Sequence, residues 1–304
     1  MRKNILMVVI FSVVTSFGQE IKVSSGKVER LKDFKSKYVP PRNVDIWLPE
    51  KYSKNNSYAV LYMHDGQMLF DDTNTWNRQE WGVDETITNL LNEGVIKDVI
   101  VVGIWNTKNR HAEYFPQKPF ESLSIEALEM INQNLKEANR VDTELQPLSD
   151  NYLKFIVNEL KPYIDSKFYT LKDKENTFIA GSSMGGLISM YALCEYPEVF
   201  GAAACISTHW PGIFSIENNP IPGAFYDYLN NNLPDPSQNR IYFDYGTATL
   251  DELYPPLQKI VDDIMESKGF SFENWNTAEF EGADHSENAW RERLRYPLTF
   301  LLRK

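Results

Sequence analysis

The sequence predicts an α/β fold in which helices cover both faces of a mostly parallel sheet. Short runs rich in β-branched residues alternate with helical patterns along the chain of 304 residues. Several runs are apolar at nearly every position, which is typical of parallel strands buried on both faces. No internal repeat, Gly/Ser-rich linker or low-complexity tract marks a boundary. Residues 19–304 are therefore expected to form a single domain.

These patterns locate the individual elements. The predicted strands are 44–49, 58–63, 99–105, 177–181, 201–207 and 240–246, with a further strand-like run at 274–280. Apolar residues at i, i+3 and i+4 predict helices over 84–91, 151–164, 184–194, 253–267 and 288–302. The stretch 117–148 is charged and weakly patterned, and a helical insertion over the pocket is expected there. In such sheets chemistry takes place at the carboxyl ends of the strands, so functional residues are expected in the loops that follow them.

The first residues have the pattern of an export signal. Arg2 and Lys3 precede an apolar run at 5–14, and Ser16 and Gly18 provide small residues before a cleavage point. This pattern predicts a secretory signal peptide over residues 1–18 and a periplasmic or secreted protein. An anchoring membrane helix is the alternative, but it needs about 20 apolar residues, and this run is shorter. No cysteine follows the run, so a lipoprotein anchor is excluded and no stable membrane anchor is expected after cleavage.

Composition excludes several classes of function. The chain has 31 Lys+Arg against 42 Asp+Glu, a formal net charge of −11, which disfavours binding to nucleic acid and to anionic membranes. Two Cys and four His are too few for a Cys/His zinc cluster, so no structural metal is expected. Cys194 and Cys205 lie in separate apolar elements, where two buried thiols are favoured over a disulfide.

A nucleophile candidate follows the strand at 177–181. There the chain contains G-x-S-x-G centred on Ser183 and leads directly into a helix, which is the context that a nucleophile elbow requires. Gly181 and Gly185 permit a tight turn that exposes the serine hydroxyl in a strained backbone conformation. The helix N-terminus behind it favours negative charge. An ordinary glycine-rich turn is the structural alternative, and Ser182 is the weaker nucleophile candidate.

A serine nucleophile needs a base to accept its proton and an acid to orient that base. His285 lies in a loop before the last helix, where the chain order nucleophile, acid, histidine places the base. Asp251 follows a strand and precedes a helix, whereas Asp244 lies inside the strand. Asp251 is therefore favoured over Asp244 and Glu252 as the acid, although an Asp at this position also suits a helix N-cap.

The oxyanion of an acyl-transfer intermediate needs two N–H donors. Met184, the residue after the nucleophile, is expected to supply one. The loop after the strand at 58–63 is expected to supply the other, since Gly66 allows close backbone approach. Gln67 N–H is the favoured donor, with Gly66 next, and His64 is interpreted as a buried histidine.

Five separated blocks together resemble a known family. They read YAVLYMHDGQMLFD with WGVDE, VVGIWNTKNRHAEY, FIAGSSMGGLISMYA, YFDYGTATLDELY and GADHSENAW. Through them the chain resembles the putative esterase family of α/β-hydrolases, which includes feruloyl and acetyl xylan esterases, enterochelin esterases, S-formylglutathione hydrolase and mycolyltransferases. The resemblance implies an α/β-hydrolase fold, Ser183, Asp251 and His285 as the catalytic triad, and no metal or organic cofactor.

Loops around the predicted site are rich in aromatic residues. His209 and Trp210 follow a strand in a loop shaped by Pro211, and are expected to face the substrate. Arg110 and Tyr114 follow another strand end and could bind a polar part of the substrate. For each of these residues, core packing or a structural ion pair is the alternative.

The sequence therefore predicts an exported serine esterase that forms an acyl-enzyme at Ser183. Small-molecule or polysaccharide-linked acyl esters are the expected substrates, because exported members of the family commonly deacylate polysaccharides. A siderophore-type ester hydrolase and an acyltransferase are the enzymatic alternatives. A non-catalytic relative that only binds ligands is the third, and the intact order of Ser183, Asp251 and His285 argues against it.

Overall fold

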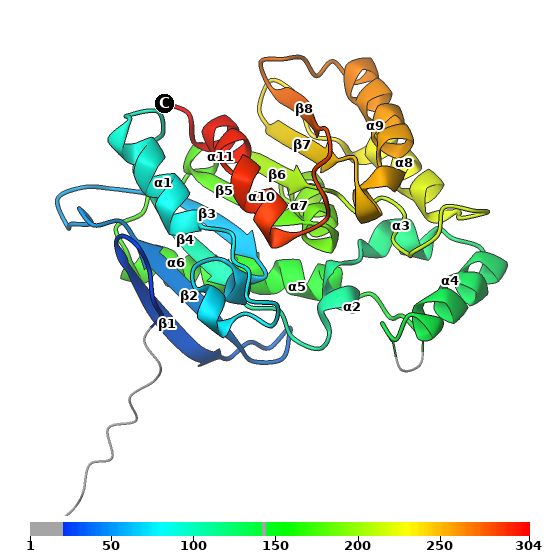
Figure 1. The fold of residues 1–304 in the computed structure, drawn as a ribbon, viewed down its shortest axis with the longest axis horizontal. Helices are drawn as coiled ribbons and strands as arrows, with labels where there is room; N and C mark the ends of the chain where they lie inside the picture. Colours follow the sequence, from blue (N-terminus) through cyan, green and yellow to red (C-terminus); the bar gives the residue numbers. More distant parts are fainter. Residues whose placement is uncertain (1–20, 142–143) are drawn as a thin grey trace, which may run out of the picture.

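The computed structural model describes residues 21–141 and 144–304. One eight-stranded sheet runs through this part of the chain in the order β1-β2-β4-β3-β5-β6-β7-β8 (Figure 1). The six neighbouring strands β4, β3, β5, β6, β7 and β8 pair in parallel, while β2 is antiparallel to both β1 and β4. The strands are β1 (Lys27–Phe34), β2 (Arg42–Leu48), β3 (Ala59–His64), β4 (Val99–Ile104), β5 (Thr177–Ser182), β6 (Ala202–Ile206), β7 (Arg240–Gly246) and β8 (Trp275–Phe280). The predicted mostly parallel α/β fold is confirmed. The predicted signal peptide, residues 1–18, lies outside the described residues.

Helices cover both faces of the sheet (Figure 1). The α-helices are α1 (Val83–Asn92), α2 (Arg110–Tyr114), α3 (Gln117–Glu121), α4 (Ile125–Glu137), α5 (Ser149–Phe155), α6 (Lys161–Lys167), α7 (Met184–Glu195), α8 (Ile221–Asn232), α9 (Pro255–Ser267), α10 (Glu287–Arg293) and α11 (Arg295–Leu302). Short helical turns are η1 (Gly66–Met68), η2 (Asp72–Asn74), η3 (Ile156–Leu160, a π-helical turn), η4 (Lys174–Asn176) and η5 (Thr249–Leu253). Within the described residues, no helix has the length and apolarity that a membrane crossing requires.

Two hydrophobic clusters lie on opposite faces of the sheet. One contains side chains of α1, α10 and α11, and the other contains side chains of α5 to α9. β3 contributes to both, because Val60 and Tyr62 belong to one cluster and Leu61 and Met63 to the other. This arrangement explains why the inner strands are apolar at successive positions.

Among the strands and α-helices, three were not anticipated from the sequence, and two predicted helices are divided. β1 is the edge strand, and its sequence KVERLKDF has the charged, partly exposed character that protects sheet edges. The other two unanticipated elements are the helices α2 and α8, and the predicted helix 288–302 is divided into α10 and α11. The predicted helix 151–164 is interrupted by the π-helical turn η3, which ends shortly before Pro162, a residue without an N–H to continue the helical bonding.

Candidate active site

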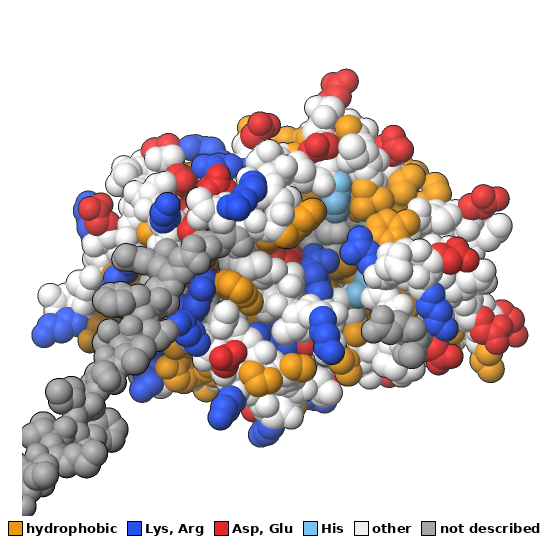
Figure 2. Space-filling model, turned by 60° about the horizontal axis from the view of Figure 1, so that its bottom comes forward, with side chains coloured by type: hydrophobic (Ala, Val, Ile, Leu, Met, Phe, Trp, Pro, Cys, Tyr) orange, Lys and Arg blue, Asp and Glu red, His pale blue; other side chains and the backbone are white. Residues whose placement is uncertain are grey.

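The carboxyl ends of the parallel strands surround a pocket of about 730 Å³. Figure 2 shows histidine side chains beside Lys and Arg on this face of the molecule. The predicted site residues that line the pocket are Gln67, Arg110, Ser183, Met184, His209 and His285. A second hollow, of about 780 Å³, is lined by Lys97, Gly201 and Arg240, which lie at the amino ends of the strands. Because chemistry in parallel sheets takes place at the carboxyl ends, the first pocket is the candidate active site.

Ser183 lies in the sharp turn between β5 and α7. Its φ of 59° and ψ of −121° are strained for a residue with a Cβ. Ser183 N–H donates to the Ile206 carbonyl oxygen at 2.9 Å, which fixes the turn against the end of β6. The backbone is so close at this point that a Cβ on Gly181 would lie 2.8 Å from the Gly185 oxygen. The turn therefore has the geometry of a nucleophile elbow.

His285 and Asp251 form a direct pair. His285 Nδ1 lies 2.5 Å from Asp251 Oδ1, and the Asp251 side chain is fully buried. The imidazole packs edge-on against Trp290, with ring centroids 5.0 Å apart, and against Tyr254 at 6.0 Å. Since the carboxylate is the acceptor of the Nδ1 proton, Nε2 is the nitrogen left to accept a proton in the pocket.

The second carboxylate oxygen of Asp251 is also bound. Oδ2 accepts from Ser207 Oγ at 2.5 Å and from Gly246 N–H at 2.7 Å. Burial raises the pKa of Asp251, but the hydrogen bond and charge of His285, together with these two donors, outweigh burial and lower the pKa. Asp251 is therefore held as a carboxylate next to the imidazole.

Asp244, the competing acid, has other partners. Its Oδ1 accepts from Ser207 N–H at 3.1 Å and from Arg293 Nη2 at 3.1 Å. Burial raises its pKa to about 6, against the opposing charge of Arg293. The sequence analysis did not identify Ser207 or Arg293, which bridge the two acids: Arg293 Nη2 also donates to Ser207 Oγ at 2.6 Å. Ser207 directly follows β6, and this position after a strand is the sequence feature that could have identified it as a site residue.

The two expected oxyanion donors both line the pocket. Met184 is the first residue of α7, where backbone N–H groups have no acceptor within the helix. Gln67 lies in η1, and its Oε1 accepts from Asn106 N–H at 3.1 Å, which ties the loop after β3 to the end of β4. A Cβ on Gly66 would lie 2.4 Å from the Gly103 carbonyl carbon, so glycine is required for this close approach.

Arg110 lines the pocket, but its guanidinium is already engaged. Nε and Nη2 each donate to an Asp65 carboxylate oxygen at 2.8 Å. Tyr114, expected at the substrate, is fully buried, and its hydroxyl accepts from Asp65 N–H at 3.2 Å. The structure thus corrects the expectation for Tyr114, which supports the loop that carries Gln67. The ion pair is the structural alternative that the sequence analysis left open for Arg110.

His209 and Trp210 have different environments. His209 lines the pocket, its N–H donates to the Ser183 carbonyl oxygen at 3.2 Å, and its Nδ1 lies 2.9 Å from the Tyr254 hydroxyl. Burial, and then the neighbouring charge of His285, lower its pKa well below the usual value. Trp210 is fully buried, and its Nε1 donates to Gln258 Oε1 at 2.8 Å. The expectation that Trp210 faces the substrate is therefore corrected, because this bond and its packing on Phe243 hold it in the core.

Exposed aromatic and cationic side chains form the rim of the pocket. Trp76 is 83% exposed and Phe214 is 43% exposed. The Arg140 guanidinium lies 5.1 Å from the centre of the Phe214 ring. Arg140 belongs to the stretch 117–148, which forms α3 and α4 as the expected helical insertion, but only the turn after α4, at Asn139 and Arg140, lines the pocket.

Comparisons with known proteins agree with this geometry. The model of the Putative esterase family matches residues 39–301. The uncharacterized protein YbbA of Bacillus subtilis is 26% identical over 171 residues, which are 56% of this chain and 58% of YbbA. The chain spans less than two thirds of the length of each of the first three curated relatives that it matches.

Solved structures share the fold. A ferulic acid esterase from Anaeromyces mucronatus superposes with a TM-score of 0.63 at 21% identity, covering 91% of both chains. The enterobactin esterase of Shigella flexneri has a TM-score of 0.63 at 18% identity, covering 90% of this chain and 58% of the other. With 39–301 matched by the family model, the chain belongs to the Putative esterase family of the α/β-hydrolase fold.

Proposed function

We propose that the protein is an exported serine esterase that hydrolyses acyl esters of carbohydrates through an acyl-enzyme at Ser183. The observation that carries the proposal is the pairing of His285 with Asp251 in the pocket that contains the strained Ser183. These are the three roles that ester hydrolysis by a serine requires: a nucleophile, a base and an orienting carboxylate.

The reaction proceeds in two steps. Ser183 Oγ attacks the acyl carbon while His285 Nε2 takes its proton, and the charge that develops on the carbonyl oxygen is stabilised by Met184 and Gln67 N–H. The imidazolium then protonates the departing alcohol, leaving the acyl group on Ser183. In the second step His285 takes a proton from water, which attacks the acyl carbon, and the imidazolium then returns the proton to Ser183 Oγ as the bond to the acyl group breaks and the acid is released.

The rim of the pocket supports a carbohydrate-linked ester. Trp76 offers an exposed ring on which a sugar or a feruloyl ring can stack. Amide side chains of Asn77, Gln79 and Asn106 also line the pocket and can bond hydroxyl groups. The ferulic acid esterase among the structural neighbours is consistent with this substrate class.

A siderophore-type ester is the second candidate. Lys108 and Arg140 line the pocket, and among the described residues neither forms a salt bridge. Two such cations would favour a substrate that carries negative charge. The likeness to the enterobactin esterase points in the same direction.

Ser183→Ala tests the reaction, and a panel of esters tests the substrate. The variant should lose roughly 10³-fold or more in turnover, because the residues of a triad act as a unit. A fluorophosphonate probe should label the wild type and leave Ser183→Ala unlabelled, whereas near-normal activity of the variant would refute the mechanism. Acetyl, feruloyl and cyclic trilactone esters should be compared by kcat/KM. Preference for the trilactone would favour the siderophore-type alternative.

Export rests on the sequence of residues 1–18 and has its own test. The protein should be recovered from the periplasm or medium with Gln19 as its first residue. N-terminal sequencing of the recovered protein decides this, since retention of Met1 in the cytoplasm would contradict export.

A further inference from the structure

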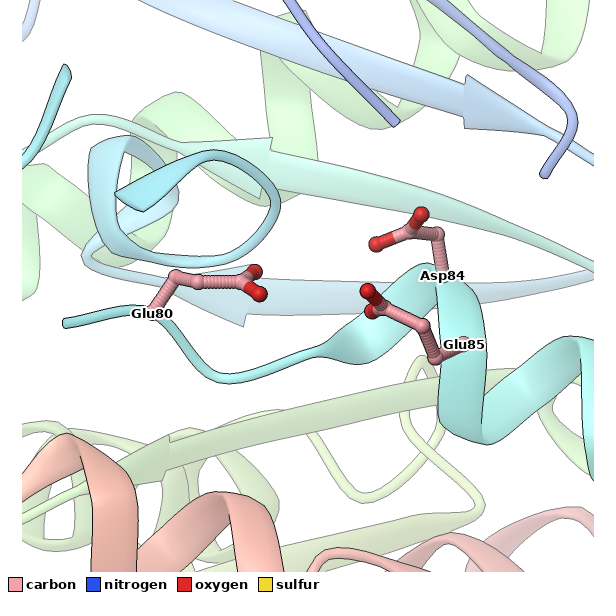
Figure 3. A group of neighbouring side chains, drawn as sticks. All are labelled: Glu80, Asp84 and Glu85. Atoms are coloured by element: carbon pink, nitrogen blue, oxygen red, sulfur yellow. The ribbon is translucent and has the colours of Figure 1, made fainter. Parts of the chain in front are cut away.

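Three carboxylates converge beside the start of α1, outside the pocket of the proposed reaction. Glu80, Asp84 and Glu85 each place one carboxylate oxygen within 4.8 Å of those of the other two. Figure 3 shows the three groups turned toward one shared space. Glu80 and Asp84 are buried, and Glu85 is partly exposed, so the space is reached from one side.

The charges of this cluster do not balance. Among the described residues, the cation that pairs with it is Arg291 of α10, which binds Glu80 Oε1 and lies 3.3 Å from Glu85 Oε1. When all three carboxylates are ionised, they and the one guanidinium have a net charge of −2. Burying uncompensated charge is costly, so a cluster of this kind needs either a further cation or a bound proton.

Asp84 supplies a separate indication of a ligand. Its side chain is fully buried, and Oδ2 accepts from Ser24 N–H at 2.6 Å. In the described part of the chain, no N–H or O–H group of another residue donates to Asp84 Oδ1 or Glu85 Oε2, and the two carboxyl groups can bond each other only through a shared proton. Buried carboxylate oxygens are normally satisfied, and Figure 3 shows the carboxylates of Asp84 and Glu85 beside the space that they share with Glu80. Burial, and then the charge of Glu85, raise the pKa of Asp84, so a proton is the competitor for this space.

We infer that Glu80, Asp84 and Glu85 form a binding site for a hard divalent cation, with Ca²⁺ as the best match. Ca²⁺ takes oxygen ligands at about 2.3–2.6 Å, so two of its ligands can lie up to about 5 Å apart, which accommodates the observed separation. Mg²⁺ requires shorter bonds and tighter octahedral geometry. Most transition metals other than Mn²⁺ favour nitrogen and sulfur ligands, which are missing from this cluster. One divalent ion also supplies the charge of +2 that the cluster lacks.

The position of the site indicates a structural role. Arg291 links the cluster to α10, and the neighbouring Trp290 packs against both His285 and Trp81. A bound cation would therefore hold α1 and α10 together behind the proposed base, without touching the reacting atoms. Its main effect is expected on stability.

Thermal melting of the full-length protein after chelation tests the site. At free Ca²⁺ about 100-fold above its Kd, the melting temperature should rise by roughly 5 °C. Asp84→Asn and Glu85→Gln should each abolish the rise, and isothermal titration should give heats with the wild type but not with these two variants. Glu93→Gln is the matched control, because Glu93 is exposed at the other end of α1 and pairs with Arg295. This control should keep the full response.

Two results would overturn the inference. One is a wild type whose melting temperature and titration heats do not respond to millimolar Ca²⁺. The other is an Asp84→Asn or Glu85→Gln variant that responds as the wild type does. If a shared proton fills the space instead, Asp84→Asn should melt at a higher temperature than the wild type at pH 8, with or without chelator. Near-UV circular dichroism checks folding, and should Asp84→Asn fail to fold, Glu85→Gln decides alone.

Discussion

Asp251→Asn should abolish most of the activity because the structure dictates how the new amide must point. Gly246 N–H donates to Asp251 Oδ2, and a backbone donor cannot be reversed. The oxygen of the introduced amide must therefore occupy the Oδ2 position, which leaves its NH₂ group facing His285 Nδ1. The imidazole then has to accept at Nδ1 and carry its proton on Nε2, so it cannot take the proton of Ser183.

The expected loss follows from this forced tautomer. In serine hydrolases the Asp-to-Asn change in the triad lowers kcat by about 10⁴-fold, which corresponds to about 5.5 kcal/mol of lost transition-state stabilisation. The pocket, the elbow and the oxyanion donors remain in place, so KM should change little. A p-nitrophenyl ester assay at pH 7, with melting temperature as the check on folding, measures both effects.

Asp244→Asn is the matched control. Asp244 is equally buried and lies in the same network, but it bonds Ser207 N–H and Arg293 rather than the imidazole. Its kcat should stay within about tenfold of the wild type, the size expected when only indirect support is lost. If Asp251→Asn retained wild-type kcat, or if folded Asp244→Asn were the crippled variant, the reasoning from the Gly246 donor would be refuted.

Other predictions concern stability and substrate contact. Burial raises the pKa of Asp244 to about 6, so between about pH 4 and pH 6 the folded protein keeps a proton that the unfolded chain has lost. The contribution of Asp244 to the free energy of unfolding therefore falls as the pH rises through this range. The difference in that free energy between wild type and Asp244→Asn, measured with urea, should decrease from pH 4 to pH 7; a constant difference would contradict it. Trp210→Ala should cost about 3–5 kcal/mol of stability, because a buried indole is replaced by a cavity, and an unchanged urea midpoint would contradict the core assignment. Trp76→Ala should leave the melting temperature and acetyl ester hydrolysis unchanged while raising KM for sugar-linked or feruloyl esters about tenfold, and an equal effect on all esters would argue against stacking.

The sheet was predictable because its signal is local. Strands such as β3 are apolar at consecutive positions, and this follows directly from burial on both faces. β1 carries the opposite signal, since an edge strand exposes charged side chains and resembles a loop in sequence. The interruption of the helix at η3 was not visible either, because the apolar spacing continues across it.

The side chains that support Asp251 were not predictable in the same way. The G-x-S-x-G turn and the order of Ser183, Asp251 and His285 can be recognised along the chain. Ser207 and Arg293, in contrast, come from the end of β6 and from α10, and only the folded sheet brings them to one carboxylate. Their role depends on contacts between residues 44 to 86 positions apart, for which a single sequence carries no periodic signal.

Trp210 and Trp76 show why the sequence alone could not identify the aromatic residue that faces the substrate. Trp210 and Trp76 both lie in loops near the carboxyl ends of strands, and local sequence favoured Trp210 as the residue that faces the substrate. The outcome was decided by Gln258, a residue 48 positions away that accepts the indole N–H and so makes burial of Trp210 favourable. Trp76 is 83% exposed at the pocket rim.

The cluster of Glu80, Asp84 and Glu85 could not be predicted from the sequence either, because its need for a counter-charge depends on burial in the fold. A count of Cys and His bears on zinc, and a net charge of −11 describes the average field of the surface. Neither can distinguish Asp84 from the other acidic residues of the chain, because what sets it apart is its burial and an oxygen without a donor in the described residues. Exposed carboxylates are solvated and need no partner, whereas a buried one must be neutralised by a proton, a guanidinium or a metal ion. The energetic demand that points to a cation therefore arises from the fold rather than from composition.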